Sequence, residues 1–151
     1  MPSPSTLSCL FVLLTAGCQN TLPHQDTHLP RRRAPDAALL NTRWVPRELG
    51  EQSVVVPEDV REPYLLLRAD GAAEGNGSCN RFRGGYTYSR EGELQFKDLI
   101  STRMACPGLD TENAFNQVLN NTRTYRISGD TLWLHDAGAN ALGRLEAVYL
   151  Q

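Results

Sequence analysis

Apolar and polar residues alternate over short runs from Asn41 onward, which predicts β-strands separated by turns. The clearest strand is the apolar run 63–69 (PYLLLRA), which ends at Asp70-Gly71, a strong hairpin signal, so that 72–76 would form the returning strand. Further strands are expected at 42–49, 85–89, 92–96, 124–127 and 131–135, and in a last strand that reaches residue 149. Gly143 in that last strand suits a bulge or a tight bend of a curved sheet.

One segment has a helical period instead, at about residues 110–121. Its apolar stripe consists of Ala114, Phe115, Val118 and Leu119. Asp110 is placed to cap the start of this helix. A helix with a single apolar stripe must pack on another element, and an antiparallel sheet is the partner that the rest of the chain offers. The predicted class is therefore α+β and mostly antiparallel, a small curved sheet or partly closed barrel of roughly seven or eight strands with one packed helix.

The beginning of the chain has the layout of an export signal. A short apolar run is followed by the small residues Ala16 and Gly17, and polar residues begin after Cys18. The string LTAGC, which ends at Cys18, resembles the lipobox of bacterial lipoproteins, although Thr15 stands where an aliphatic residue is usual. The resemblance implies a signal peptide at residues 1–17 and a diacylglycerol on the Cys18 thiol. The alternatives are a plain signal peptide with an incidental cysteine, or a cytoplasmic chain with an apolar start.

An acylated Cys18 would hold the chain at a membrane, because each buried methylene contributes about 0.8 kcal/mol. Gln19 follows it, where an Asp is the usual inner-membrane retention signal of Gram-negative lipoproteins, so the resemblance implies the outer membrane, facing the periplasm. Residues 18–40 are rich in proline and are interpreted as the lipidated N-terminus and a flexible linker before a domain at 41–151. The arginines at 31–33 are expected either to be part of a solvated spacer or to contact anionic lipid head groups.

The charge of the chain argues against a nucleic-acid partner. The formal net charge is −2, and residues 41–151 hold 12 basic and 15 acidic side chains, whereas nucleic-acid binding needs a basic face. The sequence contains no C-x-x-C pair, and His24 and His28 lie in the linker, so neither a metal site nor a cofactor is expected.

Two cysteines remain once Cys9 leaves with the signal and Cys18 is acylated. Cys79 and Cys106 are an even pair in an exported domain, which indicates one disulfide. A nucleophilic mechanism needs a free thiolate with a histidine in reach, and His135, next to Asp136, is the one histidine of residues 41–151. A disulfide would silence that thiol. No catalytic residue is therefore assigned, and a thiol enzyme using Cys79 and His135 is kept as an alternative.

Four strings in the domain carry a more specific signal. They are GNGSCNRFRGGY (75–86), LISTRMAC (99–106), ENAFNQVL (112–119) and TYRISGDTLWL (124–134). Together with Trp44 near the start of the domain, they resemble in order and spacing the META domain, the family of HslJ-like heat-shock lipoproteins. The resemblance covers about residues 41–149. It implies a β-rich fold with one packed helix, a place in the bacterial envelope, a link to heat and antibiotic stress, and no established enzymatic activity.

The cysteine motif supplies the candidate site residues. The Gly-Cys-Asn step of the family appears here with Ser78 in first position, which would be strained if that position needs a positive φ. The possible binding residues are Asn80, Arg81 and Arg103, together with Arg83. Asn80 is interpreted as a turn-maker or, alternatively, a ligand contact. The arginines would form a small anion site beside the disulfide, or else pair at the surface with Glu74, Glu93 or Asp98.

Two functions from different classes follow from these observations. The first is a lipid-anchored accessory module that binds a protein partner of the envelope. The second is a carrier that holds an apolar ligand between sheet and helix. A continuous cavity lined by Leu65, Leu67, Phe115 and Leu132 would favour the carrier, and a core filled by the same side chains would favour the module.

Overall fold

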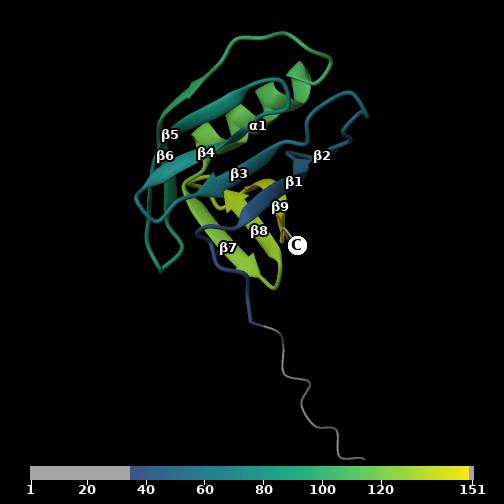
Figure 1. The fold of residues 1–151 in the computed structure, drawn as a ribbon. Helices are drawn as coiled ribbons and strands as arrows, with labels where there is room; N and C mark the ends of the chain where they lie inside the picture. The colour runs from purple at the N-terminus through teal and green to yellow at the C-terminus, as the bar shows by residue number, and fades with distance from the viewer. Residues whose placement is uncertain (1–34, 150–151) are drawn as a thin grey trace, which may run out of the picture. The chain divides into compact units, whose positions relative to one another are not determined.

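The computed structural model describes residues 35–149. Cys18, the predicted signal peptide and the arginines at 31–33 lie outside the described residues. The strands are β1 (Arg43–Leu49), β2 (Gln52–Ser53), β3 (Tyr64–Leu67), β4 (Ala72–Asn76), β5 (Arg81–Tyr88), β6 (Leu94–Ser101), β7 (Thr124–Ser128), β8 (Thr131–His135) and β9 (Ala141–Val148), and helix α1 spans Leu109–Asn121 (Figure 1). The predicted α+β class with one helix is confirmed. No helix within this range is long and apolar enough to span a bilayer.

All strands belong to one antiparallel sheet, in the order β6-β5-β4-β3-β1-β9-β8-β7, with β2 paired to β1. The sheet does not close into a barrel, but its two edge strands, β6 and β7, come together at a single bridge between Glu93 and Thr124. Two hydrogen bonds flank that bridge, from Leu94 N to Arg123 O at 3.0 Å and from Tyr125 N to the carbonyl of Gly92 at 2.7 Å. The curved, incompletely closed sheet expected from the sequence is therefore confirmed.

The core lies between the sheet and α1, which contacts β1, β6 and β9. Alternation along the strands sends one set of side chains inward, and those of Trp44, Leu67 and Leu132 are fully buried. Phe115 of the helix meets Phe82 of β5 edge to face, with ring centroids 6.0 Å apart. The indole N–H of Trp44 donates to the carbonyl of Leu39 at 3.0 Å, so this buried polar group is satisfied.

The folded part of the chain begins before Asn41. Leu39 is buried in the core, Ala37 N donates to Gly129 O at 2.9 Å, and Gly129 N donates to the carboxylate of Asp36 at 2.7 Å. These residues therefore belong to the domain rather than to the linker.

The helix begins one residue earlier than predicted, and the expected cap is wrong. Its N-cap is Gly108, which offers no side-chain hydrogen bond, and Asp110 lies inside the first turn. Gly108 is packed against Ser78 and Val60 so closely that a Cβ would clash with both side chains. Tertiary packing therefore sets the start of this helix. The bulge expected near Gly143 is confirmed, because the register of β8 with β9 shifts between Leu134 and His135.

Candidate functional site

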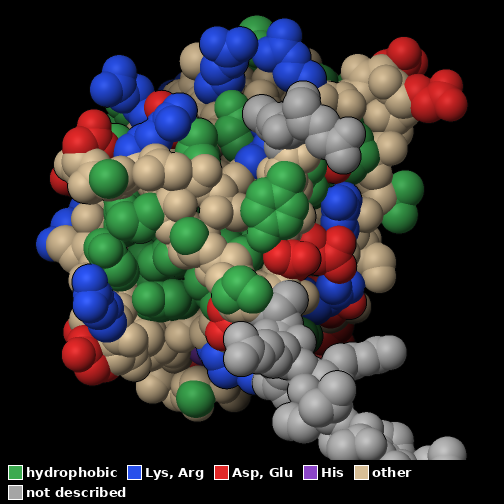
Figure 2. Space-filling model, turned by 60° about the horizontal axis from the view of Figure 1, so that its bottom comes forward, with side chains coloured by type: hydrophobic (Ala, Val, Ile, Leu, Met, Phe, Trp, Pro, Cys, Tyr) green, Lys and Arg blue, Asp and Glu red, His purple; other side chains and the backbone are tan. Residues whose placement is uncertain are grey.

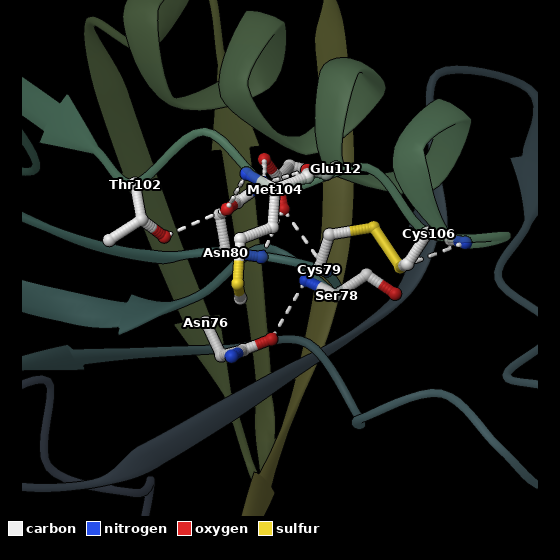
Figure 3. The surroundings of a disulfide bond; sticks show 9 residues. Asn76, Ser78, Cys79, Asn80, Thr102, Met104, Cys106 and Glu112 are labelled. Atoms are coloured by element: carbon white, nitrogen blue, oxygen red, sulfur yellow. Dashed lines mark hydrogen bonds between the residues drawn. A yellow bond between two sulfur atoms is a disulfide. The ribbon is translucent and has the colours of Figure 1, made fainter.

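A disulfide joins Cys79, in the turn between β4 and β5, to Cys106, which lies shortly before α1 (Figure 3). Their Cα atoms are 5.7 Å apart. The predicted pair is therefore present, and it ties the segment leading into the helix to the turn of the sheet. The sulfur of Cys79 is committed to this bond, and His135 lies on β8.

Asn80 stands at the centre of the region that surrounds the disulfide and is 2% exposed. Its Nδ2 donates to Met104 O at 2.9 Å and to Glu112 Oε1 at 2.7 Å, and its Oδ1 accepts from Met104 N at 2.7 Å and from the Thr102 hydroxyl at 2.8 Å (Figure 3). Two donor hydrogens and both acceptor sites of the amide are thereby used. The side chain holds the 102–104 segment in place instead of facing solvent.

Glu112 is a member of this cluster that the sequence interpretation missed. Its carboxylate is buried, at 4% exposure, and accepts from Cys79 N at 3.1 Å, Asn80 N at 2.6 Å and Asn80 Nδ2. The signal for it lay in the helical period. Glu112 precedes Phe115 by three positions and Leu119 by seven, which places it on the buried stripe.

The backbone of Ser78 has a φ of 136°, a value that favours glycine. Its residue is 4% exposed, and its N–H donates to Asn76 Oδ1 at 2.8 Å (Figure 3). The sequence prediction that a serine here would be strained is confirmed by this conformation. The turn is held by the hydrogen bond from Ser78 N to Asn76, by the disulfide, and by the hydrogen bonds from Cys79 N and Asn80 N to Glu112.

The candidate arginines are all exposed, but they do not share one hollow. Arg81 lines a hollow of about 330 Å³ with Arg43 and Arg61, and neither Arg83 nor Arg103 belongs to its lining. The suggested ion pair between one of these arginines and Glu74 is not formed, because Glu74 pairs with Arg68 at 2.7 Å instead.

The outer face of β1 and β9 carries a chain of ion pairs. Arg144 contacts Glu48 at 2.7 Å and Glu146 at 2.8 Å, and Arg47 contacts Glu146 at 3.0 Å. Hydrogen bonds from Arg47 and Arg144 hold the pKa of Glu146 below its ordinary value, and the hydrogen bond from Arg144 does the same for the pKa of Glu48. On the face drawn in Figure 2, basic side chains are spread out and several lie next to acidic ones. Within residues 35–149, no group of three His, Cys, Asp or Glu side chains is arranged to hold a metal ion.

Comparison with known proteins gives one family and a small set of similar folds. The family model described as META domain matches residues 37–149. A solved NMR structure of a protein from Burkholderia xenovorans is 24% identical, with a TM-score of 0.58 over 74% of this chain and 85% of that chain. A second NMR structure is 23% identical, with a TM-score of 0.57 over 72% of this chain and 90% of that chain. A search of curated proteins found no match. The two solved structures support the fold.

Proposed function

Because the chain belongs to the META domain family, we propose that it is a bacterial envelope lipoprotein, anchored through Cys18, whose domain is a non-enzymatic accessory module that binds a protein partner during stress. The anchor is supported by the apolar run and the small residues before Cys18. Gln19 supports sorting to the outer membrane, with the domain facing the periplasm.

The partner-binding proposal rests on Met104, whose main chain is held in place while its side chain is exposed. Both main-chain polar groups of Met104 are fixed by the buried Asn80, yet its side chain is 59% exposed. Ile100 and Leu109, near in sequence, are 65% and 37% exposed. We name residues 100–109 the presented segment. Exposed apolar side chains on a held backbone favour protein recognition, because little conformational entropy is left to lose on binding. Methionine also adapts well to different partner surfaces.

The packing of the core supports the module over a carrier. Leu65, Leu67, Phe115 and Leu132 are all fully buried and belong to one continuous cluster. None of them lines the surface hollows whose lining residues lie within 87–137, 38–149, 49–142, 49–114 or 43–81 of the domain. The disulfide likewise supports a non-enzymatic role, since it occupies the one thiol that a Cys79–His135 mechanism would use.

Photo-crosslinking in intact cells tests the partner. A photoreactive residue placed at Met104 should capture the same discrete protein as one placed at Ile100. Val55, which is 78% exposed on the β2–β3 connection, is the matched control position and should capture it far less. Equal capture from Met104 and Val55, or no discrete product from Met104 under heat or antibiotic stress, would contradict the proposal.

Metabolic labelling with a clickable fatty acid tests the anchor. The unaltered chain should take up the label, and Cys18→Ser should abolish it. Cys9→Ser, in the same apolar stretch, should leave the labelling unchanged. Label that persists in Cys18→Ser would exclude this cysteine as the acylated residue.

A further inference from the structure

The hollow beside Arg81 brings together basic side chains that are far apart in the sequence. Its lining consists of Arg43, Arg61, Glu62, Tyr64, Asn76 and Arg81, around a volume of about 330 Å³. The strand register explains the grouping. Tyr64 lies opposite Asn76, and Asn76 lies opposite Arg81, so these three side chains form one row across β3, β4 and β5. Their neighbours Leu65 and Phe82 point into the core, which sends the row to the outer face.

Asn76 supplies a donor that is already oriented. The residue is 3% exposed, and its Oδ1 is occupied by the N–H of Ser78 at 2.8 Å. Its Nδ2 donates to no other described residue. Every fully buried side-chain nitrogen or oxygen of the described residues has a partner, so this Nδ2 is not fully buried, and Asn76 is one of the residues that line the hollow. Figure 3 shows the amide oxygen turned toward Ser78 and the nitrogen turned away from it.

The charge of the hollow is strongly positive within a domain that is acidic as a whole. Its lining holds three arginines and a single carboxylate, Glu62. One oxygen of Glu62 contacts Arg43 at 3.4 Å, and its other oxygen contacts Arg47 at 3.4 Å. The guanidinium of Arg43 also lies 3.9 Å above the ring of Tyr64, which fixes its position. Arg61 and Arg81 form no ion pair with another described residue, so their donors remain available.

The number of donors indicates the class of ligand. Each guanidinium offers a fork of N–H groups that matches an oxyanion, and Asn76 adds an amide hydrogen. A carboxylate has two oxygens and cannot use all of these donors, whereas a phosphate group presents three or more. The volume also leaves room for a substituent on the phosphate.

We propose that the hollow lined by Arg43, Arg61, Asn76 and Arg81 binds a phosphate group, carried either by a soluble organic phosphate or by a phospholipid head group. Asn76 orients the group, Arg61 and Arg81 neutralise it, and Arg43 closes the hollow from the side of Tyr64. The lining of the hollow includes no residue of the presented segment, although the carbonyl of Arg81 accepts a hydrogen bond from Thr102 N at 3.2 Å. The proposal does not depend on the partner proposed above.

The side-chain amide of Asn76 is the reporter for the test. The full chain, purified in a neutral detergent and labelled with ¹⁵N-asparagine, is titrated with inorganic phosphate and with glycerol 3-phosphate at constant ionic strength. We expect a saturable shift of the Asn76 amide signal. Arg61→Gln and Arg81→Gln should each weaken the apparent affinity about fivefold. Arg83→Gln is the matched control, because Arg83 is exposed on the same strand two positions away and removes the same charge, and it should change the affinity by less than about twofold.

The source of the phosphate is distinguished by a second arm. The same chain is placed in nanodiscs of phosphatidylcholine alone or with phosphatidylglycerol, without added phosphate. Both lipids carry a phosphate, so a shift in either nanodisc identifies a lipid head group, and a shift confined to phosphatidylglycerol shows that the head group must also be anionic overall. A shift seen only with the soluble probes identifies a soluble phosphate. No saturable shift in either arm, an equal response to acetate, or equal weakening by all three arginine variants would overturn the proposal.

Discussion

Replacement of Glu112 with Ala removes the acceptor on which the buried turn around the disulfide depends. Three hydrogen bonds end on this carboxylate, from Cys79 N, Asn80 N and Asn80 Nδ2. A buried donor left without a partner costs about 1–3 kcal/mol. Water entering the space left by the side chain would satisfy part of this loss, so Glu112→Ala should lower the free energy of unfolding by about 3–5 kcal/mol. That is a large share of the stability of a domain of this size.

Urea unfolding without reductant measures this loss, with the fluorescence of the fully buried Trp44 as the signal. Asp110→Ala is the matched control. Asp110 lies in the same first turn of α1 but is exposed, so only its favourable interaction with the helix dipole is lost, about 0.3–1 kcal/mol. Glu112→Gln keeps the shape and one acceptor oxygen and should fall between the two. If Glu112→Ala costs no more than Asp110→Ala, the carboxylate does not stabilise the turn and the reasoning is refuted.

Three further outcomes can be measured with the same unfolding assay. Joint replacement of Cys79 and Cys106 with Ala should lower the free energy of unfolding by about 3.5 kcal/mol for a loop of this length, and reductant should then no longer change the urea midpoint. If reductant does not change the midpoint of the unaltered chain either, the disulfide does not stabilise the fold. Ser78→Gly should raise the stability by about 0.5–1 kcal/mol, because relief of the positive φ exceeds the added freedom of the unfolded chain, and a lower midpoint would refute that strain. Since the pKa of Glu146 is lowered from 4.5 in the folded state, its ion pairs stabilise the fold above that pH and are lost as the pH falls further, so the midpoint should decline below about pH 4.5. Arg144→Gln should make that decline smaller, and an unchanged decline would show that other groups cause it.

The strands that the sequence predicted correctly have alternating apolar residues or a strong turn signal. The β3–β4 hairpin is the best example, because Leu65 and Leu67 define a face and Asp70-Gly71 defines the turn. β2 was not predicted, since its two residues are both exposed and carry no pattern. The first half of β5 was missed because its two adjacent glycines, Gly84 and Gly85, have low strand propensity.

The sequence predicted a residue of the candidate site only where the type of amino acid alone indicated its role. Cys79 and Cys106 could be paired by counting. Glu112 could not be recognised by its type, because a glutamate in a first helical turn is usually at the surface, and only its place on the apolar stripe distinguishes it. Arg43 and Arg61 could not be grouped with Arg81, since strand register and a loop bring them together.

The near-meeting of β6 and β7 affects how molecules of this protein behave at high local density. An exposed sheet edge is a template for strand pairing with another copy, and such pairing leads to aggregation. Here one end of each edge is covered by the contact around Glu93 and Thr124. Farther along β6, the chain places its single lysine, Lys97, followed by Asp98 with a φ of 50° and a shift in register. A charged, kinked edge is a poor template for a flat ladder, so crowding of many copies does not favour polymerisation through β6.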